Sequence, residues 1–308
     1  MKQVTKSNKN SLIELMRFLF ALWVLYYHSF VPYKNEFWSN GFLAVEFFFV
    51  LSGFYLVRSI DRYAALPLKE GLPKFLLHRF KPIAVLFIIN DLFSIYYSFA
   101  IELSYNVFFG YLWYIRDLFI AITLFFLLRK YIRSQKLFYC VISILSFAAF
   151  FAFQLIPMLA WPGGPFRSVA AMPIGMLAAL IPKISVTKSN KSSVSHILLI
   201  VAGITVSSIG CLTIAVLAEK SQLLKYALVI IIFPALLYFA SCANVKCALL
   251  NWLGSLSFPI YAFQCILRII DYYWIRNETV LFVILVSLVL VYSLIENLVI
   301  WKKRKALS

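Results

Sequence analysis

Long apolar segments, repeated along almost the entire chain, constrain the fold more than any other feature of the sequence. An α-helix needs about 20 consecutive apolar residues to cross a lipid bilayer. We count ten segments that meet or approach this length, with short clusters of Lys and Arg between them. They predict an all-α, polytopic membrane helix bundle. The predicted spans lie at about 12–31, 40–57, 82–101, 109–128, 137–157, 168–181, 196–217, 223–241, 257–270 and 280–300.

The composition excludes a soluble globular domain. Hydrophobic residues make up 63% of the 308-residue chain and charged residues 13%, whereas soluble chains are about 45–50% apolar. We therefore predict one membrane domain over residues 1–308, with a short tail at 1–11 and a basic tail at 302–308. The first apolar run is too long for a cleavable signal peptide, so it is predicted to remain as the first span.

The basic residues indicate how the spans are oriented. The net charge is +17, and 21 of the 29 Lys and Arg residues fall on one side of the membrane if the spans alternate in direction. Cytoplasmic loops carry an excess of Lys and Arg, so we predict that both termini are cytoplasmic. Because these charges occur in short clusters between apolar runs, we interpret them as topology signals beside membrane lipids. Nucleic acid is not an expected partner.

Two ionisable side chains share one face of the first span. Arg17 and His28 are eleven residues apart, which is about three helical turns and roughly 16 Å along the axis. Such side chains usually face a protein interior or a wet cavity. The other interpretation is that Arg17 extends to the cytoplasmic surface and His28 lies at the opposite interface. Glu14, three residues before Arg17, is placed to be its helical partner.

The longest predicted cytoplasmic connection, residues 58–82, alternates basic and apolar residues between prolines. One interpretation is a segment held on the membrane surface by anionic lipid. The other is a binding surface for a small polyanionic molecule. The sequence has no phosphate-binding glycine loop and no cluster of His, Cys and carboxylate residues, so no metal site is predicted.

Five short motifs resemble, in the same order, those of the acyltransferase 3 family of membrane O-acyltransferases. The first is R-F-L-F-A-L-W-V-L-Y-Y-H, from Arg17 to His28, and it resembles the family's Arg and His with ten residues between them. The second is F-F-F-V-L-S-G-F-Y-L, residues 47–56, and it resembles a Phe-rich helix of the family. The later motifs are R-F-K-P at 79–82, L-W-Y-I-R-D-L at 112–118 and S-F-P-I-Y-A-F-Q at 257–264.

Two positions depart from the family's pattern. Gln264 stands where the family commonly has His, and Leu76 stands where it often has a second Arg. The resemblance therefore assigns no role to position 264. Near Leu76, His78 and Lys74 are the residues that could substitute for the missing Arg.

The resemblance implies a multi-pass enzyme of the cell (inner) membrane. Such an enzyme is a non-aminoacyl acyltransferase that moves an acyl group, usually acetyl, from cytoplasmic acyl-coenzyme A. The implied acceptor is a sugar hydroxyl of an envelope or secreted polysaccharide, or of its lipid-linked precursor. The resemblance names no protein partner.

Three residues are the principal site candidates under this hypothesis. His28 is the candidate general base, because a free imidazole titrates near pH 6.5 and can accept a hydroxyl proton at neutral pH. Arg17 and Arg79 are the candidates for binding acyl-coenzyme A, because a guanidinium pairs well with phosphate. Arg17 is also a catalytic candidate, since it can stabilise a developing oxyanion.

Three residues of the fourth motif are candidates for the acceptor entrance. Trp113, Tyr114 and Arg116 could bind the glycan, because aromatic faces stack on sugars. An interfacial aromatic belt explains the Trp and Tyr equally well, and Asp117 could simply neutralise Arg116.

Glu46, near the start of the second span, is a further candidate for substrate binding. It could pair with Arg17 or His28, or lie at the membrane interface. Arg167 follows a Pro-Gly-Gly-Pro turn. It could meet an acidic glycan, but the favoured interpretation is a loop cation without a role.

Polar residues of the last motif form a stripe. Ser257, Tyr261, Gln264 and Arg268 recur at helical spacing, so they share one face of a helix. They either face substrate or form hydrogen bonds between helices.

A different class of protein, an exporter of a small acid or a flippase of a lipid-linked sugar, also accounts for buried charges and about ten spans. The motif order and the lack of a detectable internal repeat favour the enzyme. Acylation of an amine or a small lipid is a third, weaker hypothesis.

Overall fold

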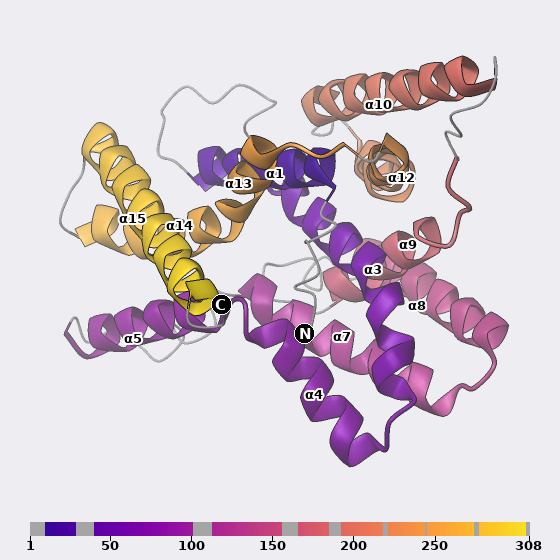
Figure 1. Ribbon diagram of the computed structural model, residues 1–308, viewed down its shortest axis with the longest axis horizontal. Helices are drawn as coiled ribbons and strands as arrows, with labels where there is room; N and C mark the ends of the chain where they lie inside the picture. Colours follow the sequence, from indigo (N-terminus) through magenta and orange to yellow (C-terminus); the bar gives the residue numbers. More distant parts are fainter. Residues whose placement is uncertain are drawn as a thin grey trace.

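The computed structural model describes residues 10–28, 40–100, 113–155, 166–184, 192–217, 221–243, 245–273 and 277–305, and this part of the chain is helical with no strands. The prediction of an all-α fold is confirmed over these residues (Figure 1). Of the predicted tails at 1–11 and 302–308, residues 1–9 and 306–308 lie outside the described part. The helices are α1 (Ser11–His28), α3 (Leu43–Ala64), α4 (Leu68–Phe80), α5 (Ala84–Ala100), α7 (Trp113–Tyr131), α8 (Gln135–Leu155), α9 (Phe166–Ala178), α10 (Ser192–Leu217), α11 (Gln222–Ala227), the π-helix η3 (Leu228–Ile232), α12 (Phe233–Ala243), α13 (Ala248–Ser255), α14 (Ser257–Tyr273) and α15 (Glu278–Lys305).

Every predicted span overlaps a helix, but fewer helices have the length and composition of a span. Four stretches of the described residues are long and apolar enough to cross a membrane: Gln135–Ala152, Val194–Leu217, Leu224–Ala243 and Thr279–Glu296. Other helices are shorter or carry charges, as α1 does with Glu14 and Arg17. The count of ten spans and the cytoplasmic termini therefore stay predictions.

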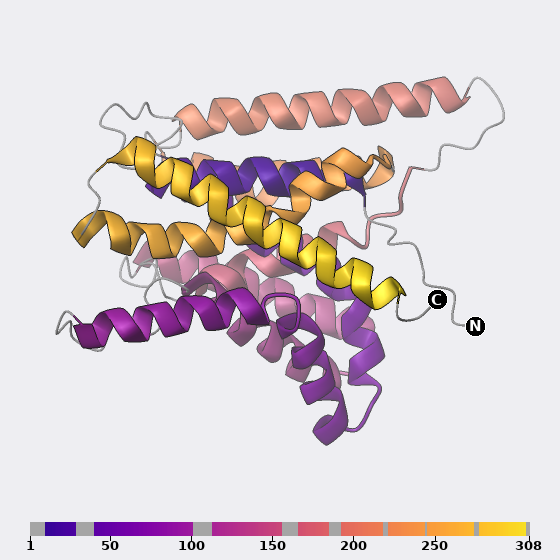
Figure 2. The same cartoon turned by 60° about the vertical axis from the view of Figure 1, so that its left-hand side comes forward.

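The peripheral helices expose large apolar side chains. Figures 1 and 2 show α10 along one edge of the bundle and α5 along the opposite edge. Phe147 of α8, Val206 of α10 and Leu294 of α15 are 73%, 68% and 64% exposed. Apolar faces of this kind need a lipid environment, which agrees with a membrane protein.

Helix α3 is the centre of the packing. Its neighbour α1 stacks Phe20 on Phe47 with 3.9 Å between ring centroids, and α9 crosses it where Gly53 and Gly175 allow backbone contact. Glu46 meets Arg167 about two turns before that crossing, so α3 and α9 run in the same direction. The most deeply buried α3 side chains include Phe47, Phe49, Leu56 and Ile60.

The long connection between the predicted second and third spans is largely helical. Helix α3 continues to Ala64, and α4 then packs on α3 and α7. Phe75 of α4 is fully buried and stacks on Phe126 of α7, with 4.9 Å between ring centroids. The connection is thus part of the folded core rather than only a surface segment.

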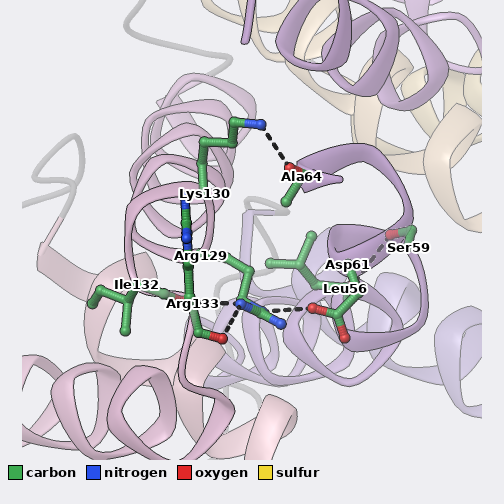
Figure 3. Close-up of polar contacts among 8 residues, drawn as sticks. All are labelled: Leu56, Ser59, Asp61, Ala64, Arg129, Lys130, Ile132 and Arg133. Carbon is green, nitrogen blue, oxygen red and sulfur yellow. Dashed lines mark hydrogen bonds and ion pairs between the residues drawn. The ribbon is translucent and has the colours of Figure 1, made fainter. Parts of the chain in front are cut away.

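Basic residues at the end of α7 hold the ends of α3 and α7 together (Figure 3). Lys130 Nζ donates to the carbonyls of Ala64 and Leu66, at 2.9 and 2.5 Å. Arg129 Nε donates to Asp61 Oδ1 at 2.6 Å, and its Nη1 donates to the Ile132 carbonyl at 2.9 Å. Cations satisfy the last carbonyls of a helix and interact favourably with its dipole. These contacts fix the parallel helices α3 and α7, which form two walls of the cavity described next.

Candidate active site

A cavity of about 300 Å³ lies between α1, α3, α4, α7 and α14. Apolar side chains form most of its wall, among them Phe48, Leu118 and Ile122. Two arginines enter it from different helices. Its polar lining residues are Arg17, Ser52, Tyr55, Arg79, Tyr114, Ser257 and Tyr261.

Arg17 is held in this cavity by the start of α1. The Ser11 backbone N–H donates to the Val245 carbonyl at 2.9 Å, which fastens α1 to the segment before α13. One turn further, Glu14 Oε2 accepts from Arg17 Nη1 at 2.8 Å, as the spacing predicted. Glu14 is only 3% exposed, and a Cβ at Gly254 of α13 would lie 2.4 Å from its Oε2. The missing side chain at Gly254 therefore makes room for the carboxylate that orients Arg17.

Arg79 reaches the cavity from the last turn of α4. Its Nη2 donates to Ser59 Oγ and more weakly to the Tyr55 carbonyl at 3.5 Å. Its Nε is buried and has no hydrogen-bond partner among the described residues. Burial lowers the pKa of Arg79 from its ordinary value, but a guanidinium stays charged in proteins. Arg79 is thus a half-buried cation whose Nε–H is available for an anionic ligand.

Hydroxyl groups of α3, α7 and α14 line the rest of the cavity. Tyr114 hydrogen-bonds with Ser52, and the Tyr261 ring meets the Tyr114 ring edge-on with 5.7 Å between centroids. Ser257 Oγ donates to the Gly254 carbonyl at 2.8 Å. The cavity therefore combines two cations, several hydroxyls and an apolar wall. No group of His, Cys, Asp and Glu suited to a metal ion occurs within the described residues.

A family model described as an acyltransferase domain, Acyl_transf_3, matches residues 10–296. This chain belongs to the acyltransferase 3 family. The prediction from the five motifs is confirmed, and the family supports a membrane acyltransferase of the non-aminoacyl kind. No curated protein and no solved structure matches the chain.

His28 of this acyltransferase lies beyond the cavity. It is the last residue of α1 and is half-buried, with its ring 4.8 Å from that of Tyr27. The α1 residues that line the cavity are Arg17, Ala21 and Val24. Because these residues and His28 follow one helical stripe, the cavity extends along α1 toward His28 and stops one turn before it. The predicted role of His28 stays a prediction.

Of the two alternatives for Glu46, the pair with Arg17 or His28 is not the one that the structure has. Glu46 Oε1 instead accepts from Arg167 Nε at 2.6 Å. The interpretation of Arg167 as a loop cation is wrong, because it lies in the first turn of α9, is 8% exposed and stacks 4.9 Å from the centre of the Trp113 ring. The two residues are 121 positions apart, so helical spacing could not predict their contact.

The other substrate-binding candidates divide into two groups. Tyr114, Ser257 and Tyr261 line the cavity. Trp113, Arg116, Glu46 and Gln264 are not among the lining residues.

Each of the residues outside the cavity has its own environment. Arg116 bonds to Asp117 through Nε and Nη2, at 3.0 and 2.9 Å, so Asp117 does neutralise it. Gln264 is buried, and its Oε1 has no partner among the described residues. The side chain of Arg268, the last member of the predicted stripe, lies outside the described part of the chain.

Our sequence analysis missed two polar lining residues, Ser52 and Tyr55. Both lie in the second motif and follow Phe48 at helical spacing, so they share its face of α3 and line the cavity with it. The face of α3 that carries polar groups was therefore a signal already present in the sequence.

Proposed function

We propose that this protein is an O-acyltransferase of the inner membrane that uses cytoplasmic acyl-coenzyme A, with acetyl as the first group to test. The proposed acceptor is a sugar hydroxyl of an envelope or secreted polysaccharide or of its lipid-linked precursor. One observation carries the proposal: Arg17 and Arg79 enter the same, mostly apolar cavity.

The two kinds of wall suit the two parts of the donor. Guanidinium groups bind phosphate through charge-assisted, often bidentate hydrogen bonds, and Arg79 Nε still lacks an acceptor among the described residues. The apolar wall suits the uncharged arm and the acyl group of the same molecule. Arg79 also belongs to the connection predicted to be cytoplasmic, the side on which acyl-coenzyme A is found.

The transfer needs a base for the acceptor hydroxyl. The hydroxyl oxygen attacks the thioester carbon and its proton passes to the base. The carbon–sulfur bond then breaks, and the protonated base returns the proton to the leaving thiolate, which releases coenzyme A as the thiol. His28 is the proposed base, and Arg17, on the same face of α1, is proposed to bind donor phosphate together with Arg79.

A pair of variants tests this assignment. In purified protein in lipid nanodiscs, Arg79→Ala should raise the KM for acetyl-coenzyme A about 10- to 100-fold, because bonds to charged groups contribute about 1.5–3 kcal/mol. His28→Ala should lower kcat for glycan acylation about 100-fold or more while the KM for the donor changes little. Labelled acetyl-coenzyme A and a mixture of envelope glycans provide the assay.

The matched control is Arg62→Ala, which removes an exposed cation of α3 from the same basic stretch. It should leave both constants unchanged. An Arg79→Ala enzyme with the wild-type KM would contradict donor binding at this cavity, and an active His28→Ala enzyme would remove His28 as the base.

Glu14→Gln tests how Arg17 is positioned. The change keeps the shape of a 3%-exposed side chain but removes the charge that holds the Arg17 guanidinium. We expect the KM for acetyl-coenzyme A to rise on the order of tenfold, equivalent to about 1.4 kcal/mol. Glu70→Gln, at an exposed ion pair with Lys74, is the control and should have no effect. An unchanged KM in Glu14→Gln would mean that Glu14 does not orient Arg17 for the donor.

A further inference from the structure

The cavity is charged near one end and apolar at the other. Its lining residues on α3 run from Val45 through Phe48 and Ser52 to Tyr55, which is about 15 Å along the helix. Arg79 lies at the Tyr55 end, because its Nη2 reaches the Tyr55 carbonyl. Val45 therefore marks the end farthest from Arg79.

Helix α1 runs antiparallel to α3, and this places its own lining residues along the cavity. Phe20 stacks on Phe47, and Tyr27 packs on Phe42 with 5.9 Å between ring centroids, so α1 and α3 are antiparallel. Arg17 accordingly lies toward the Tyr55 end of the cavity.

Val24 lies about 10 Å further along α1 than Arg17, beside the Val45 end. Val24 and Val45 are 3% and 6% exposed. One end of the cavity is therefore formed by two buried, branched side chains from facing helices.

Along α1, Val24 lies between Arg17 and His28, and Val45 lines the same end of the cavity from α3. His28 is one helical turn beyond Val24 on the same stripe of α1. A donor whose phosphates pair with Arg79 and Arg17 must direct its acyl group toward Val24 and Val45. The thioester carbon then lies at the end of the cavity nearest to the proposed base.

We propose that Val24 and Val45 form the end of an acyl pocket and limit the enzyme to short acyl groups, acetyl in preference to butanoyl. This inference rests on the proposed function. Branched side chains have few rotamers, and close-packed interiors accommodate added methylene groups poorly. A butanoyl group adds two methylenes to acetyl at the point where the pocket is closed, so its transfer should be disfavoured.

The test compares donors of different length in nanodisc-reconstituted protein. For the wild type we expect kcat/KM to be at least tenfold lower with butanoyl- than with acetyl-coenzyme A, since one methylene alone can change it about 10- to 200-fold. Val24→Ala and Val45→Ala should each raise the butanoyl-to-acetyl ratio tenfold or more. Two independent variants keep the test valid if one of them fails to fold.

Val289→Ala is the matched control, because Val289 is equally buried at 4% exposed but lies in α15, outside the cavity lining. It should lower thermal stability without changing the ratio. If both cavity variants keep the wild-type butanoyl-to-acetyl ratio of kcat/KM, the valines do not limit acyl-chain length. In that case this inference fails and the proposed function stands. If the wild type uses no acyl-coenzyme A of any length, the proposed function fails and this inference fails with it.

Discussion

Gly175→Ala is expected to prevent recovery of the folded protein, or to lower its unfolding temperature sharply. The added Cβ would lie 1.8 Å from the Val50 carbonyl oxygen and 2.9 Å from the Phe54 backbone nitrogen. These are backbone atoms in the interior of α3, so relief requires α3 and α9 to move apart. Overpacking a well-packed core costs about 1–3 kcal/mol, and sometimes more. We expect at least the upper value here, measured by thermal unfolding in detergent.

Gly210→Ala provides the control for this prediction. Gly210 also lies within a helix, α10, but its added Cβ would first meet Ile232 Cδ1 at 3.0 Å, the flexible end of a side chain. Alanine favours a helix by about 1 kcal/mol over glycine, so this variant should be as stable as the wild type or slightly more so. Equal unfolding temperatures for Gly175→Ala and Gly210→Ala would contradict the close crossing of α3 and α9.

The sequence predicted which segments are helical better than where the helices end. Apolar residues mark the part of a helix that can lie in a membrane, but a helix continues past that part when its polar residues find partners. The predicted span 40–57 thus corresponds to α3, Leu43–Ala64, whose last turn is held by Arg129 and Lys130. Helix α4 was not predicted, because Pro67 and Pro73 are typical of a loop. Its stability depends on contacts with α3 and α7.

The candidate site could be predicted only in part, because motifs and helical spacing identify residues on one helix but not their partners on another. Arg17 and Arg79 were identified from motifs, and the fold places both in one cavity. Residues on one helical face, such as Ser257 and Tyr261, follow from spacing alone. Contacts between helices do not, because a single sequence does not encode which charged groups meet. The pair of Glu46 with Arg167 is the clearest example.

Arg167→Met is expected to lower the free energy of unfolding by about 3–5 kcal/mol, because it leaves the Glu46 carboxylate buried without its partner. The two side chains are only 10% and 14% exposed. Methionine keeps most of the volume but loses the ion pair and the cation–π contact with Trp113, 4.9 Å from the ring centre. The measurement is chemical unfolding in mild detergent.

The double variant Arg167→Met with Glu46→Gln should recover much of this loss, because it removes both charges from the protein interior. Lys74→Met is the control: it breaks the exposed Glu70–Lys74 pair, whose side chains are 47% and 57% exposed, and exposed helical pairs contribute about 0.3–0.5 kcal/mol. If Arg167→Met lowers the free energy of unfolding no more than Lys74→Met does, water reaches the Glu46 carboxylate. Recovery in the double variant would instead locate the cost in the unpaired charge, which distinguishes a buried ion pair between α3 and α9 from a simple loss of side-chain packing.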